Sequence, residues 1–116
     1  MTRSLRRLGY VTLEARNADE ALRLIAQERS PVDLVLSDVL MPGIDGGELR
    51  DRLAEVRPGL PVLLMSGFGL DDLIAQGRLD PGTVLLQKPF TATALASCVR
   101  EVLDRSHSES NKVLHR

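Results

Sequence analysis

The strongest constraint on the fold is a regular alternation between short aliphatic runs and segments with helical periodicity. Three runs are mainly apolar, namely VDLVLSD at 32–38, which has one polar interruption before its end, PVLLMS at 61–66 and TVLLQ at 83–87. Continuous aliphatic runs of this length are typical of parallel strands that are covered on both faces. The segments between them have the length and apolar spacing of helices. The pattern therefore predicts an α/β fold with a doubly wound parallel sheet.

The rest of the chain extends this alternation. Residues 2–8 resemble the end of an amphipathic helix, and residues 10–15 predict a fourth strand. Asn17, Asp45 and Thr91 stand where side chains cap helices. We expect helices over residues 18–28, 47–56, 71–76 and 92–104. Residues 1–105 are expected to form one domain, and 106–116 a loose polar tail.

Composition narrows the classes of function. The chain has 116 residues and a net charge of -1, which gives no electrostatic case for binding nucleic acid or a membrane. The longest apolar runs are too short to span a bilayer, and no signal peptide is recognisable. The single cysteine, Cys98, allows no disulfide within the chain and fits a reducing compartment. We therefore expect a cytoplasmic protein.

Three predicted strands end in functional groups: Asp38, Ser66 and Lys88. Because the carboxyl ends of parallel strands meet at one edge of a sheet, an acid, a hydroxyl and an ammonium group are expected to converge there. Lys88 can neutralise charge near Asp38, and Ser66 can donate a hydrogen bond to an oxyanion. Together they would surround a phosphoryl group on the Asp38 carboxylate, since positioning and charge stabilisation dominate phosphoryl transfer.

The motifs SDVLMPGIDG, VLLMSGF and LLQKPF, in this order, resemble those of the receiver domains of two-component response regulators. The likeness covers about residues 9–105. In detail, MSGF, LDPG and LQKPFTATALASCVREVLD are most similar to receivers of hybrid sensor histidine kinases. The resemblance implies a CheY-like (flavodoxin-like) fold and a phosphoacceptor in a two-component phosphorelay. It also implies a histidine kinase or histidine phosphotransfer protein as partner, and no enzyme activity beyond self-catalysed phosphoryl transfer.

The resemblance also implies residue roles. Asp38 would accept the phosphoryl group from a phosphohistidine, and Ser66 would be the switch hydroxyl that moves toward it. Lys88 would pair with the phosphoryl oxygens, and the bond to Pro89 would be cis. Asp38 and the backbone carbonyl of Leu40 would be ligands of Mg²⁺.

Two departures from the family stand out. The family begins with a strand followed by an acidic pair that holds Mg²⁺, and both would fall before residue 1. We therefore expect a sheet lacking its first strand and weak or absent Mg²⁺ binding, with Met1 an internal start or the chain a fragment. The gap would expose two sheet edges, which allows a dimer or strand-swapped form. Leu85 also stands where the family often has an aromatic switch residue.

Other classes fit the sequence less well. A haloacid-dehalogenase-like phosphatase would need a second acid at position 40, which is leucine, and the GxxxxGK[ST] motif of P-loop nucleotide binders is absent. A dinucleotide site would need GxGxxG, whereas residues 67–69 give only GFG. The alternative that stays open is a degenerate, unphosphorylated receiver that acts as a protein-interaction module.

Overall fold

The computed structural model of the chain describes residues 2–27, 32–40, 43–105 and 112–115, and helices and strands alternate along them. The helices described are α1 (Thr2–Arg7), α2 (Ala18–Gln27), α3 (Gly46–Val56), α4 (Leu70–Ala75) and α5 (Ala92–Arg105). The strands described are β1 (Val11–Glu14), β2 (Leu34–Asp38), β3 (Val62–Ser66), β4 (Leu85–Gln87) and β5 (Lys112–His115). The predicted elements are confirmed to within two residues at nearly every boundary. Pro31, Met41 and Pro42 lie outside the described residues.

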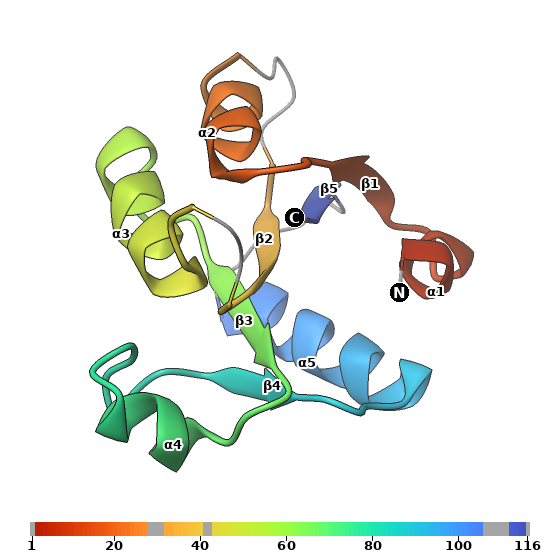
Figure 1. Ribbon diagram of the computed structural model, residues 1–116. Coiled ribbons are helices and arrows are strands. Elements are labelled where there is room, and N and C mark those ends of the chain that lie inside the picture. The colour runs from red at the N-terminus through yellow and green to blue at the C-terminus, as the bar shows by residue number, and fades with distance from the viewer. Residues whose placement is uncertain (1, 28–31, 41–42, 106–111, 116) are drawn as a thin grey trace.

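The strands form one parallel sheet in the order β1-β5-β2-β3-β4 (Figure 1). This is the predicted doubly wound parallel sheet. The strand order reverses beside β2, because the chain moves outward from β2 through β3 to β4 and then returns to the middle with β5. The carboxyl end of β2, at Asp38, thus lies near the point where ligands bind in open α/β sheets.

Helices cover both faces of the sheet. On one face α1 and α5 pack with a cluster that includes Leu5, Leu36, Leu63 and Val99. On the other face α2 and α3 pack with a second cluster, and α4 completes a third with Leu64. The interiors are almost entirely aliphatic, as the scarcity of aromatic residues predicts. The central strands are buried on both sides, which explains their uninterrupted aliphatic runs.

The helix caps confirm the sequence signals. Asn17 accepts a hydrogen bond from the backbone N–H of Glu20 at 2.8 Å, and Asp45 accepts one from Glu48 at 2.9 Å. Thr91 does the same for α5, through a bond of 3.0 Å from the N–H of residue 94. Each satisfies one of the backbone donors that have no partner within a helix. Within the described residues, no helix combines the length and the apolarity needed to cross a membrane.

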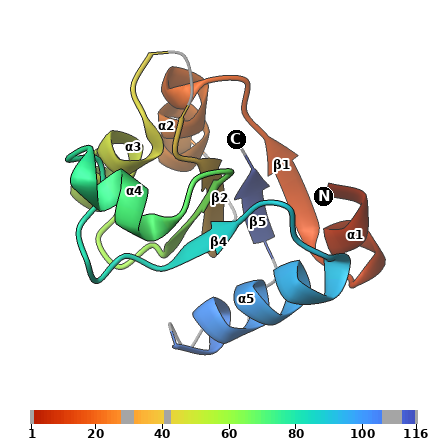
Figure 2. The ribbon, with the colours of Figure 1, turned by 60° about the horizontal axis from the view of Figure 1, so that its bottom comes forward.

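The expectation of a loose tail is wrong for Lys112–His115. These residues form β5, which lies between β1 and β2 and pairs with both (Figure 2). The expected pair of open sheet edges is therefore also wrong. Val113 and Leu114 are fully buried, so the short apolar pair inside a polar sequence has a physical role. Residues 106–111 and 116 lie outside the described part of the chain.

The connection through α5 follows the same rule of handedness as the other crossovers. The crossovers from β1 to β4 run in one direction across the sheet, with α2, α3 and α4 on one face. The crossover from β4 back to β5 runs in the opposite direction, with α5 on the opposite face. A crossover that runs in the opposite direction on the opposite face of the sheet has the same handedness as the others. The central placement of β5 is thus compatible with the strong preference for one hand in parallel sheets.

Candidate functional site at the carboxyl edge of the sheet

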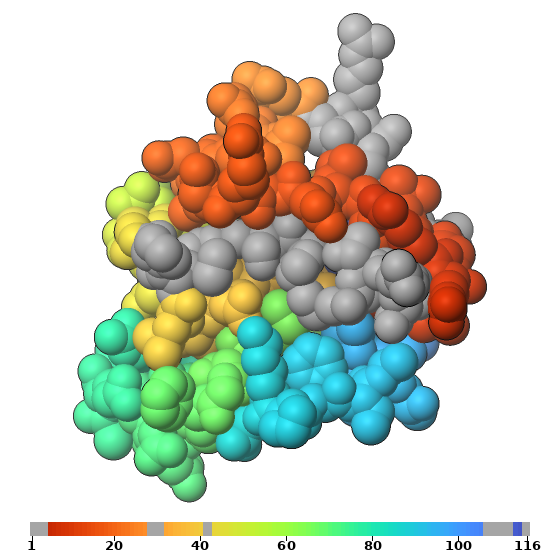
Figure 3. Space-filling model, turned by 45° about the vertical axis from the view of Figure 1, so that its right-hand side comes forward, coloured from red at the N-terminus to blue at the C-terminus, as the bar shows by residue number. Residues whose placement is uncertain are grey.

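The carboxyl ends of β2, β3 and β4 are held side by side by hydrogen bonds that continue past the paired strands. The N–H of Val39 donates to the carbonyl of Met65 at 2.9 Å, and the N–H of Lys88 donates to the carbonyl of Ser66 at 2.7 Å. Asp38 is the register partner of Met65. These bonds fix the relative positions of three strand ends, so their side chains meet in a defined geometry. In the space-filling view the segments after β2, β3 and β4 gather on one face (yellow, light green and cyan in Figure 3).

The three side chains singled out in the sequence come together at this edge. Lys88 Nζ lies 2.5 Å from Asp38 Oδ1, an ion pair that spans from β2 to the end of β4. Ser66, on the strand between them, is 5% exposed. Its Oγ accepts a hydrogen bond of 2.9 Å from the N–H of Phe68, which leaves the hydroxyl proton available to donate. The peptide bond between Lys88 and Pro89 is cis.

A pocket of about 190 Å³ opens directly above these groups. It is lined by Asp38, Leu40, Met65, Ser66, Gly67, Phe68 and Lys88. Since a single water molecule needs roughly 10–15 Å³, the pocket has room for a tetrahedral oxyanion beside the carboxylate. Leu40 and Phe68 are 41% and 50% exposed, so apolar side chains flank the charged pair. The pocket thus combines a carboxylate, an ammonium group and a hydroxyl with an apolar rim.

Gly46 brings α3 against the back of the site. A Cβ atom at this position would lie 2.5 Å from the carbonyl oxygen of Asp38 and 3.0 Å from Cα of Val39. The N–H of Gly46 donates to the carbonyl of Val39 at 2.7 Å. The first residue of α3 is therefore packed directly on the backbone that carries the acid. Only glycine allows this close approach, and no local sequence signal marks Gly46 as a site residue.

The described residues supply few side-chain ligands for a Mg²⁺ ion. They contain no group of three or more His, Cys, Asp or Glu side chains that could hold a metal. The pocket around Asp38 offers a single carboxylate, the lower end of the one or two that usually hold Mg²⁺ in proteins together with phosphate oxygens and waters. Asp19 lines a separate pocket of about 170 Å³ that does not include Asp38.

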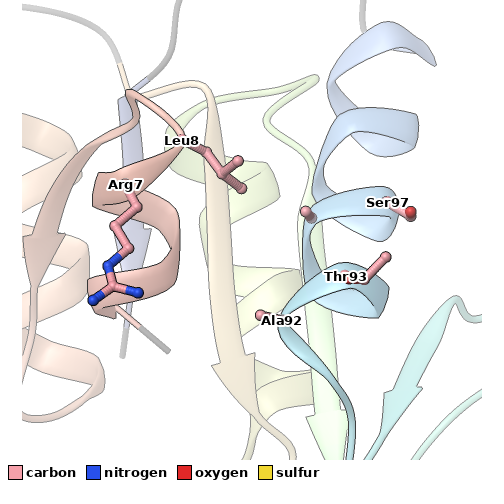
Figure 4. A pocket seen from close by; sticks show the side chains of 6 residues that line it. Arg7, Leu8, Ala92, Thr93 and Ser97 are labelled. Atoms are coloured by element: carbon pink, nitrogen blue, oxygen red, sulfur yellow. The ribbon is translucent and has the colours of Figure 1, made fainter.

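A larger hollow of about 420 Å³ lies between α1 and α5, away from these groups (Figure 4). Leu8 extends from the end of α1 toward α5 (Figure 4), and Ala92, Thr93 and Ser97, in the first turns of α5, also line the hollow. Its lining is mostly apolar, and Arg7 is its one charged member. This hollow lacks the groups for phosphoryl chemistry, so the pocket at Asp38 is the candidate site.

Comparisons with known proteins agree with this fold. Residues 1–100 match the family model described as the response regulator receiver domain. The chain is 34% identical over 103 residues to the sensor kinase CckA of Brucella abortus, which covers 89% of this chain and 11% of that protein. It is 32% identical over 95 residues to the sporulation initiation phosphotransferase F of Bacillus subtilis, covering 82% of this chain and 75% of that protein.

Solved structures give the same result. The receiver domain of the hybrid histidine kinase CckA has a TM-score of 0.71 at 34% identity, with 88% of this chain and 84% of that chain covered. The signal receiver domain of an HD domain-containing protein from Pseudomonas fluorescens has a TM-score of 0.77 at 32% identity, with 93% and 79% covered. The chain belongs to the response regulator receiver domain family, with a CheY-like fold.

Proposed function

We propose that this receiver domain accepts a phosphoryl group on Asp38 from a phosphohistidine of a histidine kinase or histidine phosphotransfer protein. The observation that carries the proposal is the convergence of Asp38, Ser66 and Lys88 on one pocket. One relative is a sensor kinase and another a phosphotransferase of sporulation, which supports a place in a phosphorelay. The lone cysteine fits a reducing cytoplasm.

The proposed step exchanges one bond for another at phosphorus. An oxygen of the Asp38 carboxylate attacks in line, the P–O bond forms, and the P–N bond to the donor imidazole breaks. The phosphoryl oxygens carry negative charge throughout, and the Lys88 ammonium group is already within ion-pair distance of the accepting carboxylate. The Ser66 hydroxyl can donate to one of these oxygens, since its own oxygen is already engaged by the N–H of Phe68. Catalysis by this chain then consists of positioning and charge stabilisation.

Asp38→Ala tests the acceptor. We expect incubation with phosphoramidate, a small analogue of phosphohistidine, to give an acid-stable but base-labile phosphoprotein from the parent chain and none from Asp38→Ala. Intact-mass spectrometry measures the uptake, and Asp80→Ala, which removes an exposed carboxylate at position 80, is the matched control. Equal labelling of the parent chain and Asp38→Ala would remove Asp38 as the acceptor.

The degenerate interaction module is the second candidate. Among the residues that the structure describes, no carboxylate cluster lies at the site, and this is the observation in its favour. The family match over residues 1–100 and the intact acid, hydroxyl and ammonium group favour phosphoacceptance instead. The same proposal includes a switch, in which Ser66 responds to the phosphoryl group and the surface that binds the partner changes. A partner-binding surface that changes only in the phosphorylated protein would support this switch.

A further inference from the structure

Two polar side chains are buried among the residues that the structure describes, and both lie on strands that lead to the site. Ser66 is 5% exposed and lines the pocket at Asp38. Ser37 is fully buried, directly precedes Asp38 on β2, and is not part of the pocket lining. The proposed phosphoryl transfer uses the hydroxyl of Ser66 but gives Ser37 no role.

Ser37 lies beside an apolar cluster, so the presence of its hydroxyl needs a reason. Its register partner on β3 is Leu64, which packs with Val39 and residues of α4. A hydroxyl removed from water costs free energy unless it makes a hydrogen bond within the protein. Alanine would occupy nearly the same space without this cost. The position therefore indicates that the hydroxyl itself is used.

The hydroxyl of Ser37 is bonded to the peptide group that follows Asp38. Ser37 Oγ donates a hydrogen bond of 2.9 Å to the carbonyl oxygen of Asp38. The N–H of the same peptide group belongs to Val39 and donates to the carbonyl of Met65 at 2.9 Å. A peptide group is planar, and its plane contains the Cα atoms of both residues that it joins. The two bonds together therefore fix the plane that contains Cα of Asp38, from which the carboxylate side chain extends.

The sheet does not supply the bond to this carbonyl in place of Ser37. In the described register pairs, the ladder between β2 and β5 ends at Leu36, two residues before Asp38. Helix α3 approaches the same oxygen so closely that a Cβ atom at Gly46 would lie 2.5 Å from it. Without the Ser37 hydroxyl, the carbonyl would be enclosed against α3 without this donor. Rotation of the peptide group would relieve that cost, and it would move Asp38.

We propose that Ser37 is a positioning residue for phosphoryl transfer. Its hydroxyl holds the peptide group after Asp38 and thereby keeps the carboxylate beside Lys88, whose Nζ lies 2.5 Å from Asp38 Oδ1. Orientation of this kind matters for rate, since a misplacement of about 1 Å can slow a reaction by about a hundredfold. The inference rests on the proposed phosphoacceptance at Asp38, but its geometry can be tested without phosphorylation.

An NMR comparison without a phosphoryl donor tests the geometry. Ser37→Ala removes the hydroxyl and Ser37→Thr keeps it. Ile25→Val is a matched destabilising control, because its cluster under α2 shares no residue with the pocket lining. We expect Ser37→Ala alone to change the chemical shift of Lys88 Nζ and the scalar coupling across the hydrogen bond from Val39 to Met65. Parent values of both in Ser37→Ala would overturn the proposal.

The threonine variant has its own safeguard. If its extra methyl group prevents folding, Ser37→Cys takes its place, because a thiol has a similar shape and donates only weakly. Values between those of the parent chain and Ser37→Ala are then expected. Values equal to those of Ser37→Ala in a folded Ser37→Thr would contradict a role of the hydroxyl.

Phosphoramidate labelling tests the consequence for the reaction. In Ser37→Ala the labelling rate at saturating phosphoramidate should fall on the order of tenfold. The half-saturating concentration should stay unchanged, because Ser66 and Lys88 are intact. Ser37→Thr should restore the rate. A parent-like rate in Ser37→Ala, or an equal fall in Ile25→Val, would overturn the positioning role. A parent chain that takes up no phosphoryl group would refute phosphoacceptance, and the NMR comparison would still decide whether Ser37 holds Asp38 in place.

Discussion

At the scale of single residues, we propose that the ion pair between Asp38 and Lys88 matters more for chemistry than for stability. Its side chains are 25% and 45% exposed, so solvent screens much of the attraction. Pairs this accessible typically contribute about 0–1 kcal/mol. The geometry nonetheless places a positive charge where phosphoryl oxygens would develop charge. Function and stability are therefore separable at this position.

Lys88→Ala is expected to separate the effect on function from the effect on stability. The free energy of unfolding should fall by no more than about 1 kcal/mol, since the pair is partly exposed. The response to phosphorylation, by contrast, should be lost even where Asp38 still takes up a phosphoryl group. Urea denaturation measures the first quantity, and the chemical shift of the Ser66 amide with and without phosphoramidate measures the second. A full Ser66 response in Lys88→Ala would contradict the role assigned to the lysine.

Gly46→Ala should destabilise the protein by a steric clash between α3 and the backbone of Asp38. A Cβ atom 2.5 Å from the Asp38 carbonyl oxygen forces the backbone of β2 or α3 to move, and overpacking of this kind typically costs about 1–3 kcal/mol. Thermal unfolding measures the loss. Gly82→Ala is the matched control, because a Cβ atom there meets no atom within 4 Å. Equal stability of the two variants would show that the close approach is not required.

The site residues differ in how far the sequence reveals them. Asp38, Ser66 and Lys88 could be predicted, because each ends an aliphatic run and parallel strands bring such ends together. Gly46 could not, because its role follows from the distance between α3 and β2, and a glycine after Asp45 reads equally well as a loop residue. Phe68 was missed as a lining residue for the same reason. Spatial approach between elements has no signal in local sequence spacing.

At the scale of elements, β5 is the strand that the sequence pattern did not predict. KVLH follows a polar stretch and has only two aliphatic residues, which is too short for a reliable periodicity. The strand forms because β1 and β2 both offer it backbone partners and because Val113 and Leu114 join the apolar clusters on the two faces of the sheet. Tertiary context thus decided an element that local propensity left undefined.

Leu114→Ala measures how much β5 contributes to the free energy of unfolding. Truncation of a fully buried leucine typically costs about 2–5 kcal/mol, whereas truncation in a loose tail would cost almost nothing. Leu8→Ala is the control, since Leu8 is 57% exposed and should change the free energy of unfolding only slightly. Chemical denaturation of both variants gives the comparison. Matching midpoints for Leu114→Ala and the parent chain would mean that β5 does not stabilise the protein.

At the scale of the whole molecule, the carboxylate count sets the expected response to metal. With one carboxylate in the pocket, Mg²⁺ alone should leave the thermal midpoint unchanged relative to a chelator. Beryllofluoride with Mg²⁺ should shift the Ser66 and Lys88 amides only weakly in this chain. It should shift them strongly in a chain extended upstream by a strand and an acidic pair. A strong response of the present chain would mean that other groups supply the ligands.

The placement of β5 also bears on how the protein is made. β1 and β5 are neighbours in the sheet, yet about a hundred residues of chain separate them. On the ribosome, β1 must therefore wait for nearly the whole domain to be synthesised before its partner exists. The β2-β3-β4 half can pair as soon as it emerges, because its strands are close in sequence. Long-range pairing of this kind slows folding, and β1 stays without its partner strand during this interval.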